Sequence, residues 1–553
     1  MIRRAILGMI AAGAVGLMAA SLESAAADGV RGGTLRLLAS SASGSLDPKI
    51  NYTLQYWSVY AYIYDGLVTF KQGAGVEGFT IVPDLAEAMP VPRDGGKTYV
   101  FQLRKGIQFA DGRAVTVKDV VSSFQRIFKV SSPTAGSFYN GIVGADACLK
   151  TPATCTLAGG VVGDEAAATV TFHLVAPDAE FFDKLAVPHA VIVPADTPAR
   201  DMGSTPIVGT GAYMFVAYDP NKQLKIVRNP HFKEWSKDAQ PDGYPDEIHY
   251  DFGLTGQAQI TAIENNQADW TFDEPPADRL AEIGTKYKDQ VHINALTAIW
   301  YAPMNTNLPP FNNLKARQAV NFAIDRNAVV KLFGGNALAA PACQVLPPGF
   351  PGYEPYCPYT LNPGTKWSAP DLARAKQLVA ESGTAGQKVT VIVADTTAAQ
   401  AIGTYLQSVL NSIGYDASVK SISGNIQFTY IQNTNNKVQI SVSIWNQDYP
   451  AASDFLNVLF GCDSFHPASD ASVNISGFCD KAIDAKMKHA LVTGVTDPAA
   501  GNREWAAIDK LVTDQSPAAV LFTPKHLDFV SKRVKHFVFN PQYYWLQNAS
   551  WIQ

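Results

Sequence analysis

Residues 438–456 read VQISVSIWNQDYPAASDFL, and the first half alternates apolar and polar residues with the period of two that predicts a half-buried strand. The polar turn Asn446–Pro450 is expected to end it, because proline cannot donate to a sheet ladder. Trp445 falls on the face opposite the aliphatic residues, so it and Asp448 meet at the strand end. Two interpretations are open: a ligand cleft, since ligands of open α/β sheets bind beyond the carboxyl ends of strands, or a solvated turn beside a packed tryptophan.

The residues before this stretch predict an α/β arrangement. Lys388–Ala394 and Asp416–Ser421 have strand patterns, and Thr397–Ile413 between them carries aliphatic residues at helical spacing. A strand–helix–strand unit implies two parallel strands joined by a right-handed crossover. Before about residue 298 the chain is richer in strand patterns, so its character changes there.

Length and composition predict a globular protein of several lobes. The 553 residues exceed the roughly 250–300 at which a single core stops growing. A net charge of −5 without a basic block argues against a nucleic-acid partner. Zinc-binding, nucleophile-elbow and phosphate-loop motifs are absent from the sequence. We therefore expect a protein that is not an enzyme and that binds no metal and no cofactor. The alternative from another class is a secreted hydrolase whose catalytic residues are distant from one another in the sequence.

The amino terminus has the pattern of an export signal. A positive start at Arg3 and Arg4, an apolar run to Ala20 and the small residues Ala25–Ala27 predict a signal peptide over residues 1–27. No cysteine lies near the expected cut, so no lipoprotein anchor is predicted. We expect the mature protein in the periplasm or another extracytoplasmic place.

Six cysteines in an exported chain predict disulfides. Fifteen pairings are possible, and we favour partners close in sequence because short loops meet most often. No CxxC or Cys/His cluster supports a metal site instead. The expected pairs are Cys148–Cys155, Cys343–Cys357 and Cys462–Cys479.

Nine further segments carry a family resemblance, and they occur in order along almost the whole mature chain. They are GGTL at 32–35, LDP at 46–48, YDGLV at 64–68, PDLAEAMPVPRDGGKTYVFQLRKGIQFADGRAVTVKDVVSSFQR at 83–126, VGTGAY at 208–213, NPHF at 229–232, MNTNLPPFNNLKARQAVNFAIDR at 304–326, WNQDYPAASDFL at 445–456 and, more weakly, FCDKAIDAKM at 478–487. Together they resemble the family 5 solute-binding proteins of bacterial ABC importers, the oligopeptide- and dipeptide-binding group.

The resemblance implies an α/β, two-lobed periplasmic-binding-protein clamshell with two hinge crossings and an extra subdomain in lobe I. A solute would bind between the lobes, and the closed form would deliver it to the permease subunits of the importer; a monomer is expected. The implied division is lobe I at 28–62, 196–298 and 516–553, its subdomain at 63–195, and lobe II at 299–515.

The resemblance also implies ligand contacts. The position matching Asp448 pairs with the amino-terminal ammonium of a peptide, and Trp445 and Asn446 supply neighbouring contacts. The segment after LDP, which holds Asn51 and Tyr52, would lie against the peptide backbone.

Trp300 and Tyr301 fall near an expected crossing, where they would line the cleft, with a role in the core as the alternative. No cation can be matched to the carboxyl end of a peptide. Members of the family also bind non-peptide solutes, so an oligosaccharide, a metal chelate or an opine is the alternative ligand. Retention of Asp448 favours a ligand that carries an amine.

Overall fold

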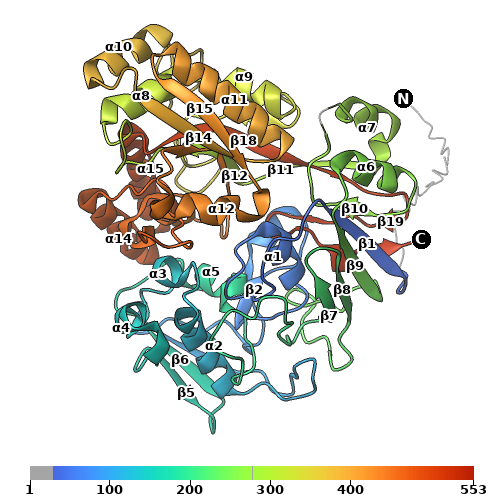
Figure 1. Ribbon diagram of the computed structural model, residues 1–553. Coiled ribbons are helices and arrows are strands. Elements are labelled where there is room, and N and C mark those ends of the chain that lie inside the picture. The colour runs from blue at the N-terminus through green and yellow to red at the C-terminus, as the bar shows by residue number, and fades with distance from the viewer. Residues whose placement is uncertain (1–28, 277) are drawn as a thin grey trace, which may run out of the picture.

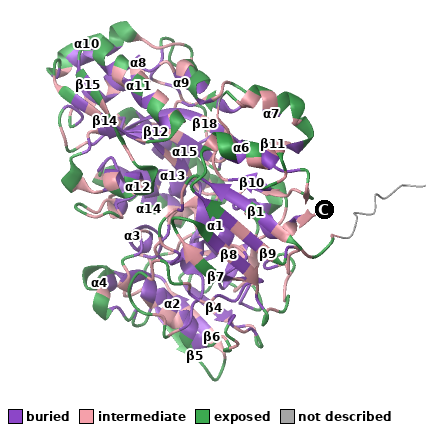
Figure 2. Ribbon diagram, turned by 45° about the vertical axis from the view of Figure 1, so that its right-hand side comes forward, coloured by how far each residue is buried: buried purple, intermediate pink, exposed green. Residues whose placement is uncertain are grey.

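The computed structural model describes residues 29–276 and 278–553, so the predicted signal peptide at 1–27 lies outside them. Figure 1 shows three bodies: lobe II above, lobe I to the right and a smaller subdomain below. The outer helices, such as α10 (Leu372–Ser382), expose one face, whereas the central strands are mostly buried (Figure 2). No helix in the described part of the chain has the length and apolarity needed to cross a membrane.

Lobe I is built on a five-stranded sheet in which β1 pairs in parallel with β9 and β10, and β8 is antiparallel to both its neighbours. Its strands, in the order β10-β1-β9-β8-β7, are β1 (Thr34–Ala39), β7 (Tyr213–Asp219), β8 (Gln223–Arg228), β9 (Glu247–Phe252) and β10 (Trp270–Thr271). In β1, Leu35 and Leu37 are buried on one face and Arg36 is exposed, as the strand period requires.

The subdomain contains the sheet β4-β6-β5 and helix α2. Its elements are β4 (Thr98–Gln102), β5 (Val161–Asp164), β6 (Thr169–His173), α2 (Val117–Lys129), α3 (Ala135–Phe138) and α5 (Phe181–Ala186). Helix α2 begins with a capping box, in which Thr116 and Asp119 satisfy each other's backbone amides.

A buried ion pair ties α2 to the LDP turn of lobe I. Arg126 donates from Nη1 to Asp47 Oδ1 at 2.8 Å and from Nη2 to Asp47 Oδ2 at 2.5 Å. It also donates to the carbonyls of Pro198 and Arg200. Both charged side chains are almost fully removed from solvent. The guanidinium therefore joins three separate chain segments through charge-assisted bonds.

Lobe II contains the predicted strand–helix–strand unit. β14 (Lys388–Ala394) and β15 (Asp416–Ile422) are parallel, and α11 (Thr397–Ser412) connects them. The aliphatic residues of α11 pack into the core of this lobe. Further helices of lobe II are α8 (Leu314–Ala323), α9 (Arg326–Phe333), α10, α14 (Lys481–Thr496) and α15 (Pro498–Gln515).

Residues 438–446 form two short strands in two sheets, so the prediction of one half-buried strand was wrong. β16 (Ile440–Ser441) pairs in parallel with β14, and β17 (Ser443–Asn446) pairs antiparallel with β12 (Ala298–Pro303). Ser441 is as fully buried as Ile440. The segment passes between packed layers, and alternation alone does not show that polar positions are covered as well.

Strand β18 (Ala518–Phe529) connects the lobes. Its first half pairs with β12 of lobe II, and its second half pairs with β11 (Val291–Ala295), which precedes β12. Figure 1 shows β11 and β18 side by side between the two lobes. At the far end of β18, Asp528 accepts a hydrogen bond from Trp270 of the lobe I sheet at 2.9 Å. The two-lobed α/β clamshell with two crossings is confirmed.

The three predicted disulfides are present. Cys148 is bonded to Cys155, Cys343 to Cys357 and Cys462 to Cys479. Within the described ranges no cysteine is left over. Each bridge closes a local loop, and the cores are held by apolar packing.

Candidate ligand-binding site

Asp448 follows the carboxyl end of β17 and is buried at the junction of the lobes, with 6% of its surface exposed. Its carboxylate accepts a hydrogen bond from the hydroxyl of Tyr52, which belongs to lobe I. Its backbone amide donates to Asp454 Oδ2 at 2.9 Å, and its carbonyl accepts from the amide of Gln542. Asp448 is therefore held from both lobes.

The loop after LDP brings Tyr52 to this position. The Asn51 carboxamide donates to the carbonyls of Ser43 and Ser45 and accepts from the amide and hydroxyl of Thr53. Its polar atoms thus shape the loop, and it is the neighbouring Tyr52 that contacts Asp448. Of the two predicted residues, Asn51 stabilises the loop and Tyr52 contacts Asp448.

Three aromatic groups surround the ring of Tyr52. Its centroid lies 5.5 Å from Trp57, 5.1 Å from His189 and 5.8 Å from Trp445, which it meets edge-on. Trp445 is 4% exposed and belongs to the hydrophobic core that spans lobe I, the subdomain and part of lobe II. The predicted proximity of Trp445 and Asp448 is present, but both groups are enclosed in this structure.

The neighbouring strand separates Trp300 from Tyr301. Tyr301 pairs with Ser443 and lies on the same face as Trp445, whereas Trp300 pairs with Ile444 on the other face. Trp300 stacks on Phe522 with centroids 5.5 Å apart. Trp300 therefore packs in the core of lobe II, which is the alternative role expected for it. Tyr301 lies on the same face of the sheet as Trp445.

Two contacts at the site have no signal in the sequence. Tyr544 donates a hydrogen bond to Asn446 Oδ1 at 2.9 Å. Gln542 accepts at Oε1 from the side-chain Nε2 of Gln447 at 3.2 Å, in addition to its contact with Asp448. Both come from the carboxy-terminal segment, almost 100 residues from the turn. Asp454, by contrast, lies within the opening stretch, where an acid close to Asp448 could have marked it.

The subdomain meets lobe II beside this turn. The hydroxyl of Ser453, at the start of α13 (Ala452–Phe460), donates to Glu180 and lies 2.9 Å from the hydroxyl of Tyr449. The ring of Phe138 meets Tyr449 edge-on with centroids 5.3 Å apart. Three bodies of the molecule therefore converge within a few residues of Asp448.

Desolvation dominates the electrostatics of these acids. Burial raises the pKa of Asp448 to about 7, against the lowering effect of the Tyr52 hydrogen bond. Burial raises the pKa of Glu180 to about 7, with the charge of Lys184 opposing it. Burial and then the charge of Asp448 hold the pKa of Asp454 well above its usual range. Ionised acids at this junction are thus costly without a cation.

A pH dependence of stability follows. The pKa of Asp448 is about 7 in the folded protein and about 3.8 ordinarily, so its protonated form is favoured by folding. The stabilisation it contributes is present at low pH and is lost as pH rises, with the loss complete above about 7. We expect the free energy of unfolding of the ligand-free wild type to fall between pH 6 and 8 by about 1 kcal/mol more than that of Asp448→Asn.

Calorimetric unfolding of both proteins at the two pH values measures this difference. The comparison cancels the histidines, including His189, whose pKa burial lowers to about 3. A wild type–variant difference that does not change with pH would contradict the raised pKa of Asp448.

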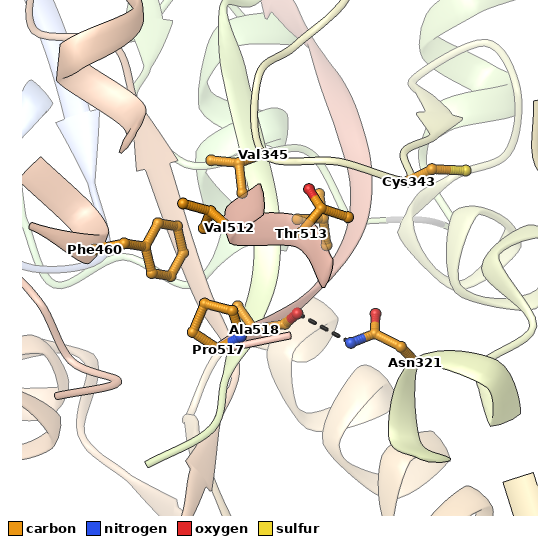
Figure 3. A pocket seen from close by; sticks show the side chains of 9 residues that line it. Asn321, Cys343, Val345, Phe460, Val512, Thr513, Pro517 and Ala518 are labelled. Carbon is orange, nitrogen blue, oxygen red and sulfur yellow. Dashed lines mark hydrogen bonds between the residues drawn. The ribbon is translucent and has the colours of Figure 1, made fainter. Parts of the chain in front are cut away.

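Two cavities away from Asp448 are each about 10 Å³, too small for a solute. A cavity of about 10 Å³ in lobe II is lined by residues that include Asn321, Phe460 and Val512 (Figure 3). This volume is at the lower limit for one water molecule. No group of three or more His, Cys, Asp or Glu side chains in residues 29–276 and 278–553 is placed to hold a metal ion. The junction around Asp448 is the candidate site.

Comparisons with known proteins agree with this architecture. A probable D,D-dipeptide-binding periplasmic protein of Escherichia coli is 24% identical over 90% of this chain and 90% of its own. A di/tripeptide-binding protein of Pseudomonas aeruginosa is 25% identical over 87% of this chain and 86% of its own. The solved structure of a clavulanic acid biosynthesis oligopeptide-binding protein has a TM-score of 0.80 at 23% identity, with 95% of this chain and 96% of that one covered.

The family assignment rests on a match over more than half of the chain. Residues 80–466 match the protein family described as "Bacterial extracellular solute-binding proteins, family 5 Middle". This range includes the long segment at 83–126 and the turn that carries Asp448. The chain belongs to family 5 of the bacterial extracellular solute-binding proteins.

Proposed function

We propose that this protein is the extracytoplasmic binding component of an ABC importer, which holds short peptides between its lobes and delivers them to the permease subunits. It acts as a monomer in the periplasm and is not an enzyme. The proposal keeps the division expected from the sequence, with lobe I at 28–62, 196–298 and 516–553, the subdomain at 63–195 and lobe II at 299–515.

The observation that carries this proposal is a carboxylate buried between lobes. Asp448 contacts Tyr52 of lobe I through its side chain and Gln542 through its carbonyl. A peptide ammonium placed on Asp448 would form charge-assisted hydrogen bonds, which are stronger in a dry cleft than in water. The hydroxyl of Tyr52 occupies one of the carboxylate's acceptor positions and leaves the others for an ammonium.

A main-chain contribution fits the same place. An extended peptide gains hydrogen bonds from strand-like segments without regard to its side chains. Strand β17 and the loop at Tyr52 face each other across Asp448, and both relatives described above are named for binding small peptides. Together these features support a ligand of a few residues.

Closure couples binding to delivery. A ligand that contacts both lobes binds the closed form more tightly than the open form, and only this difference shifts the population. The paired strands β11 and β18 between the lobes supply the crossings about which such a motion can occur.

The test is binding without turnover. The protein should retain a small peptide through purification, and mass analysis of the released molecule should identify it. Labelled di- and tripeptides should bind with saturable affinity and be recovered intact. Hydrolysis of the peptides would support the secreted hydrolase instead, and a copurified molecule without a peptide bond would contradict a peptide ligand.

A further inference from the structure

Four acids from two bodies of the molecule meet beside the candidate site. Glu180 accepts from Ser453, the residue before Asp454, and Asp454 accepts from the amide of Asp448. Asp178 lies two residues before Glu180. These bonds link the subdomain to lobe II, and Glu180, Asp448 and Asp454 are all more than nine-tenths buried.

Basic side chains do not balance these acids. Lys184 donates to Asp178 at 2.7 Å and lies 3.7 Å from Glu180. Across the described residues no other lysine, arginine or histidine forms an ion pair with any of the four acids. Lys49 is committed to the carbonyls of His189 and Val191, and its own pKa is lowered by burial and by the charge of Arg126.

Unpartnered polar atoms show what a ligand would have to bring. Asp454 Oδ1 and Gln447 Oε1 are buried without a hydrogen-bond donor in the described structure. Asp454 is fully buried. The backbone amide of Asp448 donates to its other oxygen, so the carboxyl group of Asp454 is held next to Asp448. An ammonium has three donors and no acceptor, and it matches this set. The indole N–H of Trp445 interacts with Asp454 and lowers the pKa of that acid, so it is not free for a ligand carbonyl.

We propose that the cleft selects ligands with a net positive charge over zwitterionic ones, and that Glu180 is a specificity-determining residue for this choice. The inference rests on the proposed binding of peptides and narrows their class: an amine whose carboxyl end is blocked as an amide, or is outweighed by a further cation. A ligand carboxylate in this enclosed junction meets no uncommitted cation, and above pH 7, where Asp448 and Glu180 ionise, it meets their negative charges. Such like-charge contacts lower the affinity for the zwitterionic ligand more than they raise the affinity for the cationic one.

The experiment compares alanyl-phenylalanine amide with alanyl-phenylalanine by isothermal titration calorimetry at low ionic strength and pH 8, where Asp448 and Glu180 are ionised. The two ligands share shape and ammonium and differ by one negative charge. We expect the amide to bind about tenfold more tightly or better. In Glu180→Gln, whose amide can still accept from Ser453, the ratio should fall to about threefold. Glu381→Gln, a matched change on the outer face of α10, should keep the wild-type ratio.

Each outcome separates the two proposals. Equal affinity of the wild type for both ligands overturns the charge selection and leaves peptide binding intact. A ratio that Glu180→Gln does not change overturns the role of Glu180. Failure of both ligands to bind, together with an unmodified melting curve in their presence, overturns the proposed peptide function itself.

Discussion

Asp448→Asn is expected to weaken the binding of free-amine peptides by about 2–5 kcal/mol, because it removes one partner of a buried charge pair. The same peptides with an acetylated amino terminus carry no ammonium, and their affinity should change by less than about 1 kcal/mol. Titration calorimetry of the wild type and the variant with both peptide forms gives the four constants of a double-mutant cycle.

Protein stability provides the first control. Asparagine keeps the shape of the side chain and an oxygen that can accept from the Tyr52 hydroxyl, and it removes a buried charge. Its melting temperature should be close to that of the wild type at pH 6 and no lower at pH 8. Asp416→Asn, at the exposed start of β15, is the second control and should leave both affinities unchanged.

An equal loss for free and acetylated peptides in Asp448→Asn would show that the carboxylate does not hold an ammonium. Unchanged binding of both forms would place the ligand away from β17. Neither result depends on the identity of the residues beyond the first in the peptide.

Arg126→Gln should destabilise the protein by about 3–5 kcal/mol, because it leaves the carboxylate of Asp47 buried without its ion-pair partner. The variant also loses the bonds of the guanidinium to the carbonyls of Pro198 and Arg200. The unfolding transition that contains the subdomain should move to lower temperature in a calorimetric scan.

Arg113→Gln is the matched control, since Arg113 also forms paired contacts with an aspartate. Those contacts, to Asp111 and Asp196, are solvent-exposed and should contribute about 0–1 kcal/mol. Adding Asp47→Asn to Arg126→Gln should recover part of the loss because the uncompensated charge is gone. Equal shifts for Arg113→Gln and Arg126→Gln would contradict the buried pair as the cause.

Local patterns predicted much of the fold. The strand–helix–strand unit of lobe II and the three disulfides each involve residues close in sequence, so spacing and residue type carry the information. The change of character near residue 298 was also visible, because strands and amphipathic helices have different periods.

The site was predicted less completely. Asp448, Tyr52 and Trp445 were expected near one another and are found in contact or linked through Tyr52. Asn51 was expected at the ligand, yet its amide is used by its own loop. Trp300 and Tyr301 differ by one position, and only the pairing of β12 with β17 shows which of them faces Trp445.

The sequence by itself determined the two-lobed family fold and the acid at the end of a lobe II strand, because motifs and periodicity are properties of neighbouring residues. The tertiary structure alone decided that Gln542, Tyr544 and Glu180 meet that strand end, and that both faces of residues 438–446 are buried. Contacts between segments separated by almost 100 residues or more depend on how whole bodies pack. The charge around the ligand is set by that packing.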